Sequence, residues 1–102
     1  MSTVRPPSIL NRSEQTLNVL EYELLAEKAA ALGRAGARVG ETLSKLHAHE
    51  GDAEARRVLL KAAADAVYAY FIQRELCGLR RHDDAILDLA IPKEVLLRLG
   101  AA

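Results

Sequence analysis

The fold is decided by residues 17–52, LNVLEYELLAEKAAALGRAGARVGETLSKLHAHEGD, which form a long amphipathic segment. Apolar positions recur there at helical steps of about 3.6 residues, along a single stripe. The stripe consists of Leu17, Leu20, Leu24, Leu32, Ala35, Val39, Leu43 and Leu46. Charged residues project from the opposite side, among them Glu41 and Lys45 at the favourable i,i+4 spacing. The pattern predicts one long helix with one buried and one solvated face.

Small residues occupy a strip between these two faces: Ala29, Gly33, Gly36, Ala37 and Gly40. Such a strip is compatible with the close approach of another backbone. It is equally compatible with a weak point, because each glycine costs a helix about 1 kcal/mol relative to alanine. A break between Gly33 and Gly40 would divide the helix into two pieces and allow a compact monomeric bundle. The sequence leaves both alternatives open.

Local signals place the ends of this helix. Pro6 and Pro7 favour extended backbone, so residues 1–12 are expected to form an N-terminal arm and residues 13–102 a single helical domain. Ser13 is a suitable N-cap, and Gly51 is expected to supply a left-handed C-cap near the far end. The helix is therefore expected to span about residues 13–47.

A second helix is expected from about Ala53, capped by Asp52, to Cys77, with Gly78 as its terminator. Because the connection is short, the second helix should fold back along the first. Its apolar surface is wide, which predicts packing on more than one side. A helical turn at residues 85–89 and a last short helix at residues 93–100, opened by Pro92 and closed by Gly100, complete the chain.

These elements predict an all-α fold: a long antiparallel helical hairpin with a short C-terminal helix, completed as a four-helix bundle by dimerisation. A first helix of about 50 Å, at 1.5 Å per residue, would project beyond any globule this chain can form alone. A two-fold copy is the commonest way to cover the apolar faces left over. In the expected register, facing residues have numbers that sum to about 101. Leu24 then meets Cys77, and Glu21 pairs with Arg80 or Arg81.

The length, charge balance and cysteine content of the chain limit the classes of function that it can have. At 102 residues the chain has room for one domain, and its 14 basic residues balance its 14 acidic ones, so a nucleic-acid partner is not expected. No segment approaches the length of a membrane span, and the N-terminus lacks a signal peptide. A lone cysteine, Cys77, suits a reducing compartment. A cytoplasmic protein with no membrane partner is predicted.

Three stretches carry a family resemblance: residues 6–17 (PPSILNRSEQTL), residues 73–80 (QRELCGLR) and residues 91–95 (IPKEV). Together they resemble a small family of bacterial proteins catalogued as a domain of unknown function. The resemblance covers nearly the whole chain. It implies a helical domain of bacterial origin, and it supplies no catalytic residue to carry over.

Two clusters contain residues that bind metals in other proteins, His47 and His49 at the first turn and His82 with its neighbouring aspartates. His47 and His49 are two residues apart, which points them to different sides of a helix, so a solvated turn is favoured over a metal site. Arg80 and Arg81 form the densest basic cluster and are expected to complement the negative end of the second helix. No catalytic, metal-binding or cofactor-binding residue is predicted.

The sequence therefore predicts a self-associating structural or interaction module that is not an enzyme and whose expected partner is a second copy of itself. Two alternatives stay open. One is a metal-binding protein or enzyme that uses the turn with His47 and His49. The other is a phosphate or nucleic-acid binder that uses Arg80 and Arg81.

Overall fold

The computed structural model describes residues 12–101, and every regular element in that range is a helix. The elements are α1 (Arg12–Ala48), α2 (Ala53–Leu76), α3 (Asp83–Asp88) and α4 (Lys93–Leu96). The all-α prediction is confirmed for this part of the chain. The expected N-terminal arm lies outside the described residues, except for Arg12, which is already helical.

Helix α1 is continuous through all of its glycines. Gly36 lies against Tyr70 of α2, where an added Cβ would be 3.3 Å from Tyr70 Cε1. Gly33 and Gly40 have no such neighbour within 4 Å. The alternative in which the helix breaks between Gly33 and Gly40 is therefore not the one adopted.

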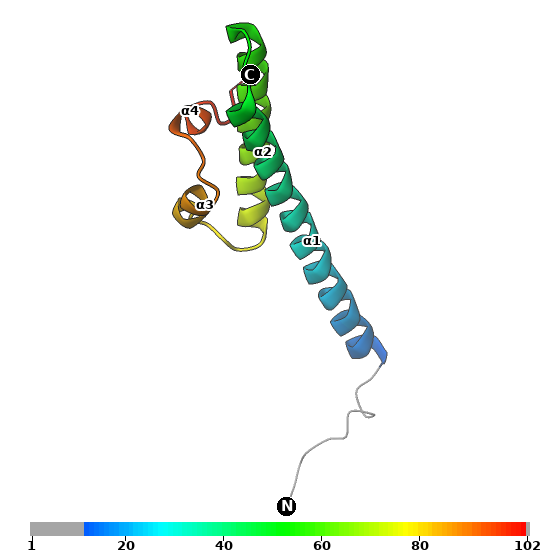
Figure 1. Cartoon of the computed structure of the whole chain (residues 1–102). Coiled ribbons are helices and arrows are strands. Elements are labelled where there is room, and N and C mark those ends of the chain that lie inside the picture. The colour runs from blue at the N-terminus through cyan, green and yellow to red at the C-terminus, as the bar shows by residue number, and fades with distance from the viewer. Residues whose placement is uncertain (1–11, 102) are drawn as a thin grey trace, which may run out of the picture.

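Helix α2 runs back along α1, and α3 and α4 lie on its other side (Figure 1). Helix α2 is thus packed on two sides, as its wide apolar surface predicts. The core lies between the second half of α1, the length of α2 and the C-terminal segment. It is formed by Val39, Leu43, Leu46, Leu60, Ala63, Ala64, Ala66, Val67, Phe71, Ile91 and Val95.

Three left-handed residues end the helices on the C-terminal side of the chain. Gly78 (φ 88°) follows α2, Ala90 (φ 51°) follows α3, and Gly100 (φ 73°) follows the last turns. After α2, Leu79 N donates to Arg74 O and Gly78 N donates to Glu75 O, which satisfies carbonyls that the helix leaves free. The same paired bonds follow α3 at Ala90 and Ile91.

The prediction for Gly51 was wrong, because it is not among the residues with positive φ. Its small size has another cause: a Cβ at this position would lie 2.6 Å from His49 Cε1. The turn is instead held by Asp52, whose Oδ1 accepts from Ala55 N at 2.8 Å and caps α2.

The register prediction was also wrong, by about one helical turn. Cys77 Sγ lies 3.8 Å from the carbonyl oxygen of Lys28, where the expected register placed Leu24. A similar offset is found where Gly36 lies against Tyr70, so α1 and α2 are shifted along each other relative to a register centred near Gly51. No ion pair joins Glu21 to either arginine within residues 12–101, and Arg81 instead pairs with Asp83 at 3.1 Å.

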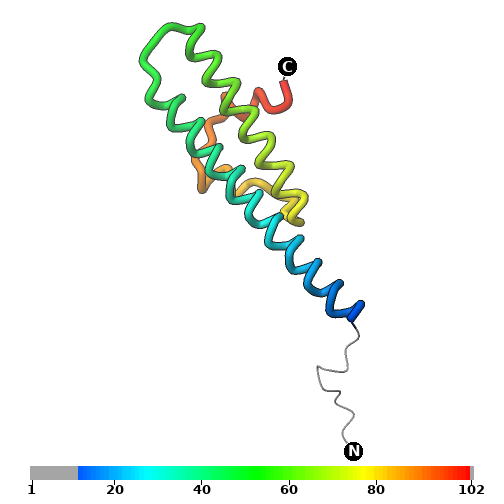
Figure 2. The backbone as a smooth tube through the Cα atoms, turned by 90° about the vertical axis from the view of Figure 1, so that its right-hand side faces the viewer, coloured from blue at the N-terminus to red at the C-terminus, as the bar shows by residue number. Residues whose placement is uncertain are grey.

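The described chain is elongated, with extents of 75 × 23 × 22 Å and a radius of gyration of 20.6 Å. A compact chain of this length would have a radius of gyration of about 13 Å. The difference arises because α1 continues past the end of α2 (Figure 2). We call residues 12–27 the α1 overhang; all of its residues are exposed.

Candidate functional site

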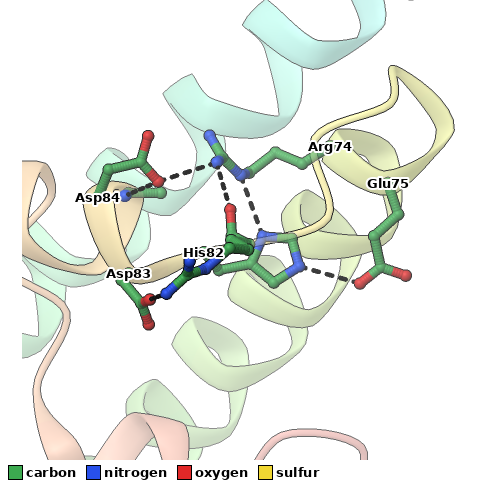
Figure 3. Close-up of polar contacts among 7 residues, drawn as sticks. Arg74, Glu75, His82, Asp83 and Asp84 are labelled. Carbon is green, nitrogen blue, oxygen red and sulfur yellow. Dashed lines mark hydrogen bonds and ion pairs between the residues drawn. The ribbon is translucent and has the colours of Figure 1, made fainter.

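A buried arginine occupies the last turn of α2. Arg74 is 7% exposed, yet it carries a charge that needs partners once removed from water. Its Nε donates to His82 Nδ1 at 3.1 Å, and its Nη2 donates to Arg81 O at 2.8 Å and to Asp84 Oδ1 at 3.0 Å (Figure 3). The guanidinium thereby ties α2 to the joint that leads into α3.

His82 extends this network. The Nε of an arginine can only donate, so His82 Nδ1 must accept, and the proton of a neutral ring is then on Nε2. That Nε2 lies 2.9 Å from Glu75 Oε2, the distance of a hydrogen bond (Figure 3). The imidazole also stacks on Phe71, with ring centroids 4.2 Å apart and planes 1° from parallel. Packing and hydrogen bonds thus fix both the orientation and the tautomer of His82.

The chemistry of this network is structural. The Nε and Nη2 donors of Arg74 are matched to acceptors of the chain itself, and Asp84 Oδ1 also accepts from Ala85 N at 2.9 Å. The network closes the end of α2 and fixes the path of the following residues. It presents neither a nucleophile nor an unpaired base toward a cavity.

The candidate metal ligands His47 and His49 lie at the end of α1, beside the turn that leads into α2. His47 is exposed, and His49 Nε2 lies 3.3 Å from the carbonyl oxygen of Asp52. The carboxylate of Asp52 is used as the cap of α2. Within residues 12–101, no group of three or more His, Cys, Asp or Glu side chains is arranged to hold a metal ion.

The basic cluster after α2 is largely engaged with neighbouring acids. Arg81 pairs with Asp83, and Arg74 pairs with Asp84, on the wall of a shallow concavity that Arg80 also lines. Cys77 is half-buried and contacts the backbone of α1. This arrangement brings Arg80 and Arg81 to one surface, but it pairs that surface with carboxylates.

The α1 overhang presents the least usual surface of the molecule. Leu17, Leu20 and Leu24 are 58%, 54% and 56% exposed, and we call these three residues the overhang stripe. They lie on the same face of α1 that carries Val39 and Leu43 in the core, because they continue its 3.6-residue period. Contiguous apolar surface of this kind marks an interaction site in soluble proteins.

A second exposed apolar line follows α2. Its positions are separated by alternate steps of four and three residues, which is the spacing of a coiled-coil seam. We call it the α2 outer stripe: Val58, Ala62, Asp65, Ala69, Ile72 and Leu76. Ala62 is half-buried and the other members are exposed, with Val58 and Leu76 62% and 60% exposed.

The N-terminal end of the α2 outer stripe borders a groove of about 460 Å³. Val58 and Ala62 form part of its apolar wall, and its cationic groups are Arg57, Lys61 and Arg98. Arg57 pairs with Glu54 at 2.6 Å and Lys61 with Asp65 at 3.2 Å. The groove thus has an apolar wall on one side, and the charged residues that line it are net positive.

The family described as a family of unknown function (DUF6665) matches residues 8–102, nearly the whole chain. The chain belongs to this family. No match was found among curated proteins or among solved structures. The DUF6665 match confirms the resemblance seen in the sequence.

Sequence reasoning missed the most buried charge of this DUF6665 protein. Arg80 and Arg81 were singled out because they are adjacent, whereas Arg74 stands alone between Gln73 and Glu75. The available signal was position: Arg74 follows Val67 and Phe71 at steps of seven and three residues, on the apolar stripe of α2. A charge in register with core residues indicates a buried, partnered group.

No helix within residues 12–101 combines the length and the apolar character that crossing a lipid bilayer would require.

Proposed function

We propose that this DUF6665 protein is a self-associating helical module in which two copies cover each other's exposed apolar surface. The observation that carries the proposal is the α1 overhang, which continues the core stripe of α1 and is not covered by any other part of residues 12–101. In this proposal the protein acts in the cytosol by binding a second copy of itself and is not an enzyme. It extends the prediction that two copies complete a four-helix core.

The stability of the overhang supports the proposal. The overhang elongates a helix that the packed half of α1 already nucleates, but its own residues gain no tertiary packing within residues 12–101. The overhang is nevertheless helical, and its leucines are more than half exposed. Apolar burial contributes about 25 cal/mol per Å², so covering these side chains would stabilise both the helix and the assembly.

A second copy related by two-fold symmetry is the simplest way to bury these side chains. Closed cyclic dimers are the commonest assemblies of identical chains, and their interfaces use the same patches on both copies. The alternative at His47 and His49 has weaker support, since no third possible metal ligand is grouped with them within residues 12–101. The alternative at Arg80 and Arg81 is weaker because this pair borders Asp83 and Asp84.

The test is the mass of the purified protein in solution. Light scattering at micromolar concentration should give about twice the chain mass of 11.1 kDa. Leu20→Asp should shift the mass toward that of one chain while circular dichroism remains helical, because Leu20 touches no core residue of its own chain. A wild-type mass of one chain across the micromolar range would contradict the proposal.

A further inference from the structure

We propose that His82 is a pH-sensitive switch at the joint between α2 and α3, residues 77–82. The neutral imidazole holds the joint closed against the end of α2, and protonation of the ring opens the joint while α4 stays docked. The switch belongs to the C-terminal segment and not to the α1 overhang, so it does not depend on the self-association proposed above.

The closed joint requires one ring nitrogen without a proton. Arg74 Nε can only donate, and it lies 3.1 Å from His82 Nδ1, which therefore has to accept (Figure 3). A second proton on the ring would place an N–H group at Nδ1, opposite the N–H group of Arg74. The hydrogen bond would then become a contact between two cations. Water screens this contact poorly, because the side chains of Arg74 and His82 are only 8% and 15% exposed.

The charged groups around the ring come from α2, the joint and α3. They are Arg74, Glu75, Arg80, Arg81, Asp83 and Asp84. On α1, Lys28 lies beside Cys77, and within residues 12–101 it forms no hydrogen bond or ion pair with these six groups. The three carboxylate side chains are between 56% and 78% exposed, so water screens their attraction for a protonated ring. The buried Arg74, in direct contact with Nδ1, therefore has the larger effect.

Helix α3 depends on this joint for its position. No Cα atom of α3 lies within 8 Å of another helix in the described part of the chain. Its apolar anchors are Ala85, which is buried, and Ile86, which is half-buried against the core. Loss of the bond between Arg74 and His82 would therefore loosen a segment that has little other packing.

The other end of the C-terminal segment should respond differently to acid. Arg56 Nη1 and Nη2 donate to the two carboxylate oxygens of Glu94 at 3.1 and 2.6 Å, and this interaction lowers the pKa of Glu94. The pair therefore stays charged over the range of about pH 5 to 8 in which histidines gain a proton. Val95 of α4 also has no exposed surface. Mild acid should thus open the joint and leave α4 in place.

Amide hydrogen exchange of the wild-type chain, at about pH 7.5 and about pH 5.5, measures the opening. The reporters in the joint and α3 are Leu79 N, which donates to Arg74 O, and Ile86 N, which donates to His82 O. After correction for the intrinsic exchange rate, their protection should fall about fivefold or more in acid, since an opening coupled to one proton can change up to tenfold per pH unit. The amide of Val95 should keep its protection. Unchanged protection at Leu79 and Ile86, or an equal fall at Val95, would overturn the inference.

His82→Asn separates the ring proton from other effects of acid. The amide oxygen of asparagine can accept from Arg74 Nε but gains no proton in this range, so protection of the joint should be similar at both pH values. The matched control is His47→Asn, which changes an exposed histidine at the end of α1 and should keep the wild-type response. A wild-type response in His82→Asn would assign the opening to another group and refute the switch.

Glu75→Gln tests the same switch without altering the ring, should His82→Asn fail to fold. Glutamine keeps an acceptor for His82 Nε2 but removes the charge that favours a protonated ring in the closed joint. The fall in protection of Leu79 and Ile86 between the two pH values should therefore be at least as large as in wild type. A smaller fall would show that Glu75, and not Arg74, governs the response, and it would overturn the inference.

Discussion

The two halves of α1 carry the same apolar period but lie in opposite environments. Val39, Leu43 and Leu46 are at most 4% exposed, because α2 runs beside them. Leu17, Leu20 and Leu24 are more than half exposed, because α2 ends at the level of Lys28. An amphipathic pattern thus predicts which face of a helix is apolar. It does not predict whether that face packs on the same chain or on another one.

The largest difference between the halves should appear when a charge is introduced. Val39→Asp would bury an unpaired carboxylate at a position with no exposed surface, and it should cost about 4 kcal/mol or more, a large share of the stability of an ordinary domain. Leu20→Asp, measured by urea denaturation at a concentration where the chain is monomeric, should change stability by less than about 0.5 kcal/mol. Equal losses at both positions would show that one chain covers both halves.

The next largest difference in stability is expected between substitutions of a buried arginine, Arg74, and an exposed one, Arg81. Arg74→Met removes three hydrogen bonds from a buried site and leaves His82 and the carbonyl of Arg81 without their donor. We expect a loss of about 3 kcal/mol in the free energy of unfolding. Arg81→Met is the control: its side chain is 89% exposed and its ion pair with Asp83 is solvated, so thermal denaturation should show almost no change. A loss for Arg81→Met as large as that for Arg74→Met would refute this account of the network.

Substitutions of two glycines of α1, one in open space and one against α2, should differ in stability by up to about 1 kcal/mol. Gly33→Ala places a methyl group in open space and should stabilise the helix by about 1 kcal/mol. Gly36→Ala has the same propensity gain, but its Cβ would press on Tyr70 at 3.3 Å, so the gain should be reduced or reversed. Chemical denaturation of the two variants measures the difference directly. Identical gains would indicate that Tyr70 moves aside without cost.

The smallest effect concerns the ion pair that joins α4 to α2. Arg56 Nη2 lies 2.6 Å from Glu94 Oε1, and this hydrogen bond lowers the pKa of Glu94. A lowered pKa contributes stability that is present at neutral pH and is lost as the pH falls through that pKa. Glu94→Gln should therefore be slightly less stable than wild type at pH 7, and the two proteins should converge in acid. A difference that grew as the pH fell would contradict this assignment.

Much of the fold follows from local chemistry, and so it was predictable. Asp52 and Gly78 lie where α2 begins and ends, because caps and left-handed residues satisfy backbone groups close to them in sequence. Ser13 is not the N-cap that was predicted, since Arg12 before it is already helical. The register of α1 against α2 and the backbone conformation of Gly51 were not predicted correctly. Packing between the two helices decides the first, and the geometry of the turn decides the second. The network around Arg74 was missed because its partners come from a segment seven to ten residues away, across a joint without regular structure.

The sequence by itself determined that this chain is helical, where α1 and α2 begin and end, and which face of α1 is apolar, because hydrogen bonds and side-chain period in a helix are local properties. Only the tertiary structure decided that α1 passes unbroken through Gly33, that Arg74 is the buried charge, and that the apolar face is covered along one half of α1 and exposed along the other. Those outcomes depend on the relative lengths of α1 and α2 and on the path of the C-terminal segment. Packing between distant segments sets them, and no short stretch of sequence contains that information.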